Sequence, residues 1–204
     1  MNAPRAHDLL WGLASTELPP EAPGWARAAL VGGQPVVVRR ALCDEGRVAV
    51  GVRGLARDQR LAWDMALSAV SRVLSPEAIR GERTDGLPAL QALAELTPAL
   101  DDSGLAWGPT GGVGYQLASG VCVLHAASDL DLLLRTHEPL AREQACALLA
   151  RLERAPCRVD VQLQVPAGAV ALREWASGAR RVLLKSALGA RLVSDPWQVQ
   201  ECAA

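Results

Sequence analysis

The sequence predicts an α+β fold, in which a small N-terminal α+β domain precedes a larger domain of mixed helix and strand character. Three observations indicate this fold. Residues 35–52 have the pattern of a β-hairpin, residues 130–134 form a short apolar run, and residues 159–165 alternate between apolar and polar side chains. Segments with helical periodicity separate these strand-like stretches.

The N-terminal half is organised around the hairpin. Valines fill both of its strands, and the turn at 44–46 reads Asp-Glu-Gly. Between residues 59 and 74, apolar residues recur at intervals of three or four, which predicts an amphipathic helix. Ser75 and Pro76 then supply a cap and a first-turn proline for another short helix.

The C-terminal half alternates between helical and strand-like patterns. Its expected elements are a helix from about residue 87, a glycine-rich loop at 108–114, a strand at 130–134, a helix at 138–154, a strand at 159–165 and further structure near 175 and at 181–184. The run at 130–134 is apolar on both faces, so we expect it in the middle of a sheet. A polar, glycine-punctuated stretch at 81–87 marks the boundary between domains at 1–82 and 83–204.

Composition and charge exclude several classes of protein. Apolar residues make up 50% of the 204 residues, which is enough for a core and excludes a disordered chain. The formal charge of -1 argues against the extended basic surface that nucleic acids and anionic membranes require. No apolar run approaches the roughly 20 residues of a transmembrane helix, and the five cysteines contain no Cys-x-x-Cys pair. We expect a soluble, cytoplasmic protein that binds neither nucleic acid nor membrane.

The strongest chemical signal is a set of three aspartates on two predicted strands. Side chains alternate along a strand, so Asp129 and Asp131 project from one face while Leu130 and Leu132 face a core. Two carboxylates so close together repel each other unless a cation lies between them. Asp160 stands in an apolar strand, where an unpaired carboxylate is costly. If the two strands are adjacent, the three carboxylates form a cradle for Mg²⁺.

A glycine cluster precedes these aspartates and points to phosphate binding. Backbone amides approach phosphate oxygens closely only where no Cβ intervenes, and residues 108–114 contain four glycines. Thr110, Gly111 and Gly112 are therefore candidate phosphate ligands. A glycine-rich turn or an Asp-x-Asp pair is common by itself, but the two in this order with a third strand aspartate favour a functional site.

A polyphosphate ligand also requires cationic side chains. The candidates are Arg39, Arg40, Arg53, Arg57, Arg60, Arg135 and Lys185, the only lysine. Residues 53–60 lie where a strand meets the predicted helix, whose N-terminus favours anions, but a solvated face beside Asp58 explains this cluster equally well. His7 is expected to be peripheral, and Trp107 is either a core residue or a stacking partner for adenine.

The order of the motifs resembles the nucleotidyltransferase superfamily of the DNA polymerase β type. That superfamily has a Gly-Gly or Gly-Ser pair, then an Asp-hydrophobic-Asp strand, then a later hydrophobic-Asp-hydrophobic strand. Within it, the whole chain resembles the MdcG family, the malonate decarboxylase holo-acyl-carrier-protein synthases. The segments that carry this likeness are RAHDLLW (5–11), PVVVRR (35–40), VRGLARDQR (52–60), GPTGGVG (108–114), SDLDLLLR (128–135), RVLLK (181–185) and DPW (195–197).

This resemblance implies a fold and a reaction. The catalytic domain would have a mixed sheet with flanking helices. It would transfer phosphoribosyl-dephospho-CoA from 2'-(5''-triphosphoribosyl)-3'-dephospho-CoA to a serine of the apo acyl-carrier subunit of malonate decarboxylase, releasing diphosphate. Two Mg²⁺ ions would bind Asp129 and Asp131, and Asp160 would share a metal or accept the serine proton. Gly112 stands where the family more often has Ser, and Thr110 is the candidate replacement.

Two alternatives stay open. The same fold would also suit transfer of a nucleotide from an NTP to a protein or a small molecule, whereas the near-neutral charge counts against tRNA as an acceptor. A non-catalytic binding partner of a carrier-protein complex is the second alternative. The presence of all three aspartates counts against it.

Overall fold

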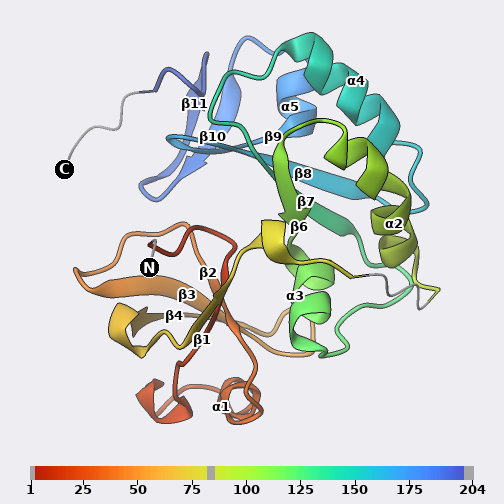
Figure 1. Ribbon diagram of the computed structural model, residues 1–204. Coiled ribbons are helices and arrows are strands. Elements are labelled where there is room, and N and C mark those ends of the chain that lie inside the picture. Colours follow the sequence, from red (N-terminus) through yellow and green to blue (C-terminus); the bar gives the residue numbers. More distant parts are fainter. Residues whose placement is uncertain (1–2, 82–85, 200–204) are drawn as a thin grey trace.

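The computed structural model describes residues 3–81 and 86–199, and it is built on two β-sheets (Figure 1). The first sheet is antiparallel throughout and has the strand order β4-β3-β2-β1-β5. Its strands are β1 (Leu9–Trp11), β2 (Val36–Val38), β3 (Arg47–Arg53), β4 (Arg60–Ala66) and β5 (Arg72–Leu74). Helix α1 (Gly24–Val31) packs its alanines against this sheet. The predicted hairpin is confirmed as β2 and β3.

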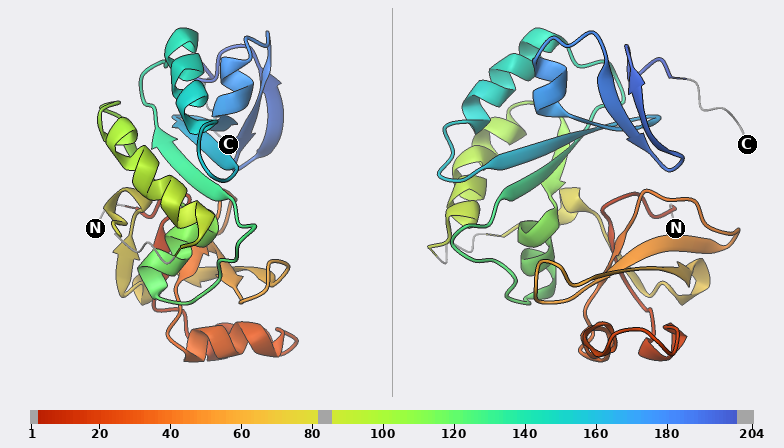
Figure 2. Two further views of the ribbon diagram at one scale, coloured as in Figure 1. Left: turned by 90° about the vertical axis from the view of Figure 1, so that its right-hand side faces the viewer. Right: turned by 180° about the vertical axis from the view of Figure 1, so that it is seen from behind.

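The second sheet is mixed and has the order β11-β10-β9-β8-β7-β6. Its strands are β6 (Ala106–Pro109), β7 (Leu130–Arg135), β8 (Val159–Val165), β9 (Gly168–Ala171), β10 (Val182–Ser186) and β11 (Gly189–Val193). Only β7 and β8 are parallel to each other. The helices of this half are α2 (Pro88–Asp101), α3 (Gly111–Ser119), α4 (Arg142–Leu152) and α5 (Leu172–Ala176). Figure 2 shows α2, α4 and α5 on the side of the sheet that faces away from the first sheet.

Strand alternation decides which side chains the second sheet presents to the first. Leu130, Leu132 and Leu134 of β7 are fully buried in the core formed with α2, α4 and α5. The residues between them project from the opposite face, toward the first sheet. Strand β8 behaves in the same way, with its valines and Leu163 in the core and its polar residues on the other face. The expected central apolar strand is therefore confirmed.

The helix predicted for residues 59–74 is wrong. This segment forms β4, a 3-10 turn at Leu67–Ala69 and β5. The large apolar residues Leu61, Trp63 and Met65 alternate and pack on the first core, which is a strand pattern. The intervening alanines produced the apparent helical spacing, and pairing with β3 along the full length of β4 decides in favour of the strand.

Two other expectations concern the connection between the halves. The short helix after Ser75 is a single 3-10 turn at Pro76–Ala78. The proposed domain boundary near residue 82 lies in 82–85, which is outside the described residues. None of the helices in the described ranges combines the length and hydrophobicity that a membrane span needs.

Polar contacts join the two sheets directly. The Tyr115 hydroxyl of α3 donates to Gln34 Oε1 at 3.1 Å and lies 3.3 Å from the Pro35 carbonyl oxygen. Arg40 donates to Gln164 Oε1 of β8 at 2.6 Å. These bonds fix the first sheet in place opposite the polar face of the second.

Candidate active site

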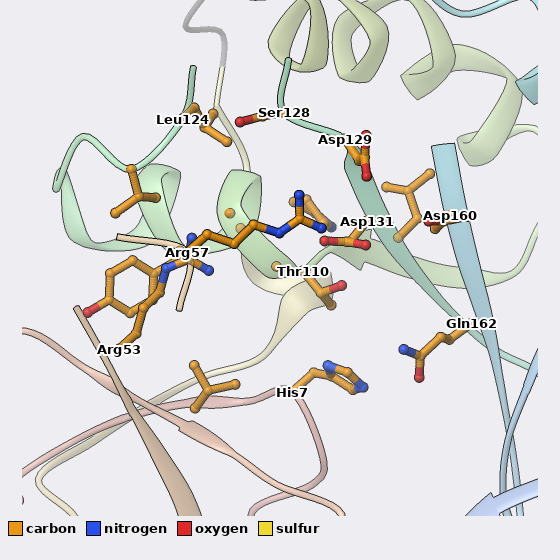
Figure 3. A pocket seen from close by; sticks show the side chains of 18 of the residues that line it. His7, Arg53, Arg57, Thr110, Leu124, Ser128, Asp129, Asp131, Asp160 and Gln162 are labelled. Atoms are coloured by element: carbon orange, nitrogen blue, oxygen red, sulfur yellow. The ribbon is translucent and has the colours of Figure 1, made fainter. Parts of the chain in front are cut away.

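A cavity of about 1010 Å³ lies between the two sheets. Its walls include Asp129, Asp131 and Asp160 from the second half of the chain, and Arg53 and Arg57 from the first half (Figure 3). The structure therefore brings all three aspartates of the sequence analysis to one cavity. The N-terminal half contributes most of the facing wall.

The register of β7 and β8 places the carboxylates together. Asp131 pairs directly with Asp160 across the parallel strands, and both side chains project from the face opposite the core. Asp129 comes just before β7 and lines the same cavity. Burial raises the pKa of the Asp131 carboxyl, and the nearby charges of Asp160 and Asp129 raise this pKa further.

This donor set fits Mg²⁺ that arrives with a phosphate ligand. Among the described residues, no three His, Cys, Asp or Glu side chains converge closely enough to hold a metal by themselves. Asp160 is instead paired with Arg158 at 3.0 Å. Mg²⁺ is commonly held by one or two carboxylates together with substrate phosphates and water. The raised pKa of Asp131 shows a carboxylate whose charge a cation would stabilise.

The glycine cluster forms the start of α3 beside these carboxylates. Strand β6 ends at Pro109, and Thr110 is the N-cap residue of α3. The Thr110 N–H donates to the Asp131 carbonyl oxygen at 2.8 Å, which ties the helix start to β7. Gly111 has a φ of +56°, and a Cβ there would overlap the Asp131 carboxylate. Only glycine allows the helix N-terminus to approach Asp131 so closely.

The cations come mainly from the β3–β4 hairpin, where Arg53 ends β3, Arg57 lies in the connecting loop and Arg60 begins β4. The Arg53 guanidinium lies over the Tyr115 ring at 5.3 Å and is close to Gly112. Burial lowers the pKa of Arg53 to about 10, so it stays charged at neutral pH. The Arg57 side chain extends toward Asp131 (Figure 3), and the charges of Arg53 and Arg57 oppose the upward shift in the Asp131 pKa. Arg60 lines the same wall and donates to the Gln59 carbonyl oxygen at 2.9 Å.

The structure places the other sequence candidates differently. Lys185 and Arg39 line the cavity, as expected for phosphate-binding candidates. Arg135 is not at the cavity: its side chain is buried and bridges Asp8, at 3.6 Å, and Glu77. The expectation that Arg135 holds phosphate is corrected: it shares a face of β7 with Asp131 but lies four residues further along the strand, where it meets Asp8 and Glu77.

Trp107 is a core residue and does not line the cavity. It is buried, and its Nε1 donates to Asp101 at 2.9 Å. The structure therefore supports the interpretation of Trp107 as a core residue and not as a stacking partner for adenine.

His7 and Gln162 are two of the cavity residues that the sequence analysis did not predict as site residues. His7, expected to be peripheral, lines the cavity because β1 lies in the interior of the first sheet, between β2 and β5. Gln162 lines it because it is two residues beyond Asp160 on the same face of β8. The alternation that grouped the aspartates would also have identified Gln162, whereas nothing local in the sequence distinguishes His7.

Comparisons with known proteins agree along the whole chain. The model of the phosphoribosyl-dephospho-CoA transferase MdcG N-terminal domain matches residues 5–76, and that of the MdcG C-terminal domain matches 61–196. A Pseudomonas putida (strain W619) protein named phosphoribosyl-dephospho-CoA transferase is 64% identical over 204 residues, which is 100% of both chains.

More distant relatives carry the same name. One from Pseudomonas fluorescens (strain Pf0-1) is 57% identical over 100% of both chains. Another from Azotobacter vinelandii is 58% identical over 96% of this chain and 95% of its own. No solved structure matches significantly. Because both domain models match in order and full-length relatives share more than half of their residues with it, the chain belongs to the MdcG family of phosphoribosyl-dephospho-CoA transferases.

Proposed function

We propose that the chain transfers phosphoribosyl-dephospho-CoA from 2'-(5''-triphosphoribosyl)-3'-dephospho-CoA to a serine of the apo acyl-carrier subunit of malonate decarboxylase, with release of diphosphate. The observation that carries this proposal is the cavity itself. One wall holds three carboxylates with the glycine-rich start of α3 beside them, and the facing wall holds arginines. This is the pairing of groups that a metal-bound polyphosphate requires.

The cations and the helix start would hold the triphosphate. Arg53 and Arg57 are charged donors on the wall opposite the carboxylates, and the first turn of α3, with Gly111 and Gly112, lines the same cavity. We propose that the leaving diphosphate lies here. Lys185 and Arg60 add positive charge elsewhere on the cavity wall.

The carboxylates would act at the α-phosphate. Asp129, Asp131 and Asp160 are the proposed ligands of Mg²⁺, which when bound would neutralise the triphosphate and polarise the phosphorus. The serine oxygen forms a bond to the α-phosphorus as the bond to the leaving diphosphate breaks. The serine proton passes to a base, for which Asp160 is the candidate because its side chain is 42% exposed and so accessible to an incoming serine.

The fold supports a place in the polymerase-β-type nucleotidyltransferases. The second sheet is mixed, and its two parallel strands carry Asp131 and Asp160 in register. The helix that follows Thr110 begins beside them. We also propose that the protein works in the cytoplasm, because the cysteines in the described residues are free thiols.

Mass spectrometry of the apo carrier subunit tests the reaction. The carrier is incubated with the protein, Mg²⁺ and triphosphoribosyl-dephospho-CoA, with ATP as a parallel donor. We expect a mass gain equal to phosphoribosyl-dephospho-CoA that is lost with EDTA. A gain with ATP alone would favour the alternative NTP-dependent transferase, and no gain with either donor would favour a non-catalytic carrier-binding protein.

A further inference from the structure

The backbone of His7 is the feature of the cavity that the proposed chemistry does not use. His7 has a φ of 74°, the one positive φ at a non-glycine residue in the described chain. An L-residue in this conformation carries backbone strain, because its Cβ comes too close to the following carbonyl oxygen. Strain of this kind is kept where the surrounding structure enforces it and is concentrated at functional sites.

The turn that contains His7 is held on both sides. The His7 N–H donates to the Val38 carbonyl oxygen at 3.0 Å, and the Asp8 N–H donates to the Arg5 carbonyl oxygen at 2.9 Å. The Asp8 carboxylate accepts from the Arg5 N–H at 2.8 Å and approaches buried Arg135. These contacts keep the imidazole in the cavity wall.

Gln162 faces His7 from the opposite sheet (Figure 3). Its buried Oε1 makes no hydrogen bond of good geometry among the described residues, although the neighbouring His7 ring approaches it closely enough for Gln162 to counter part of the fall in the His7 pKa. A buried acceptor without a well-aligned donor is costly, so this amide is complementary to a donor that a ligand brings. Gln162 and His7 thus form an uncharged polar pair on facing walls of one cavity.

We propose that His7 and Gln162 bind the hydroxyl groups of the ribose that carries the triphosphate. This inference rests on the proposed function. It concerns the ribose, which is a part of the donor that a bare polyphosphate lacks. In Figure 3 the pair lies below the carboxylates, whereas Arg57 approaches Asp131 from the left. With the phosphates toward the arginines, the sugar attached to the α-phosphate extends toward His7 and Gln162.

The spacing and the charge of the pair suit a sugar. Gln162 lies two residues from Asp160 on the same face of β8, or about 7 Å along the strand, which is roughly the span of one sugar ring. Burial, reinforced by the charge of Arg40, lowers the pKa of His7 to about 4, so the ring is neutral at physiological pH. A neutral ring both donates and accepts hydrogen bonds and suits hydroxyls better than phosphate oxygens.

This proposal is tested by binding measurements made in the absence of the carrier protein. The dissociation constants of triphosphoribosyl-dephospho-CoA and of inorganic triphosphate are measured with Mg²⁺ by titration calorimetry. His7→Gly and Gln162→Met are each expected to raise the dissociation constant of the donor about tenfold and to leave that of inorganic triphosphate unchanged. Arg57→Ala is the matched control, and it should weaken both ligands.

The His7 variants also separate a binding role from a structural one. His7→Gly removes the backbone strain, so its melting temperature should equal or exceed that of the wild type while donor binding weakens. His7→Asn tolerates the same φ and keeps a polar side chain, and it should recover part of the donor affinity. Unchanged donor affinity in folded His7→Gly and Gln162→Met, or an equal loss for both ligands, would overturn the proposal.

The failure of the ribose site and the failure of the proposed function are distinguishable. If the wild type binds the donor no more tightly than inorganic triphosphate, the ribose site is wrong. If the donor binds with the expected dependence on His7 and Gln162 but no mass is transferred to the carrier, the ribose site stands and the proposed acceptor is wrong.

Discussion

The substitution Gly111→Ala should separate the geometry of the site from the stability of the fold. A Cβ at Gly111 would overlap the Asp131 Oδ2 and would lie 2.8 Å from Asp131 Cγ. Since carbon contacts are comfortable at about 3.5–4.0 Å, the carboxylate must move by about 1 Å. A displacement of that size at reacting groups costs about 100-fold in rate. The φ of +56° adds about 1–2 kcal/mol of backbone strain.

A matched control lies at the other end of the same helix. Gly120 has a φ of +74°, and a Cβ there would meet nothing within 4 Å. Gly120→Ala therefore carries the backbone strain without displacing Asp131. Both variants should melt about 2–8 °C below the wild type, but only Gly111→Ala should lose transfer activity, followed as holo carrier formed per minute. If the two variants retain similar activity, close packing of Gly111 on Asp131 does not position the carboxylate.

Three further predictions concern charged residues in the cavity and between the two halves. Asp131→Asn should melt above the wild type at pH 7 in EDTA. The pKa of Asp131 is raised in the folded state, so the wild type loses stability as the pH rises through that pKa. Calorimetry at several pH values should show the difference in melting temperature vanish below the ordinary Asp pKa of about 3.9. Arg135→Ala leaves Asp8 and Glu77 without their buried partner and should lower the free energy of unfolding by about 3–5 kcal/mol in urea titrations; a loss below 1 kcal/mol would contradict this. Arg57→Ala should raise the KM for the donor at least tenfold with an unchanged melting temperature, since its guanidinium points into the cavity.

The alternation of apolar and polar residues along the strands is the sequence pattern that predicted most of the site. It grouped Asp129 with Asp131 and isolated Asp160, and the parallel register of β7 and β8 then brings Asp131 and Asp160 side by side. The same reasoning predicted the buried face of β7. It depended only on local geometry, which a sequence displays directly.

The failures have a common physical cause, which is dependence on the other half of the chain. Residues 59–74 are strands because β3 provides a pairing partner for β4. Arg135 is a bridge because Asp8 and Glu77 converge on it from positions more than 50 residues away. His7 enters the cavity because β1 is an interior strand. No window of the sequence contains these long-range partners, so local patterns could not predict them.

The division of charge between the two walls has a thermodynamic consequence. Without a ligand, Arg53 and Arg57 of the β3–β4 hairpin already offset part of the carboxylate charge, as their effect on the pKa of Asp131 shows. A free divalent cation is therefore repelled by the arginines, and a free polyphosphate is repelled by the carboxylates. A preassembled metal–polyphosphate complex satisfies both walls at once, so the two ions should bind cooperatively, each raising the affinity for the other by the same factor.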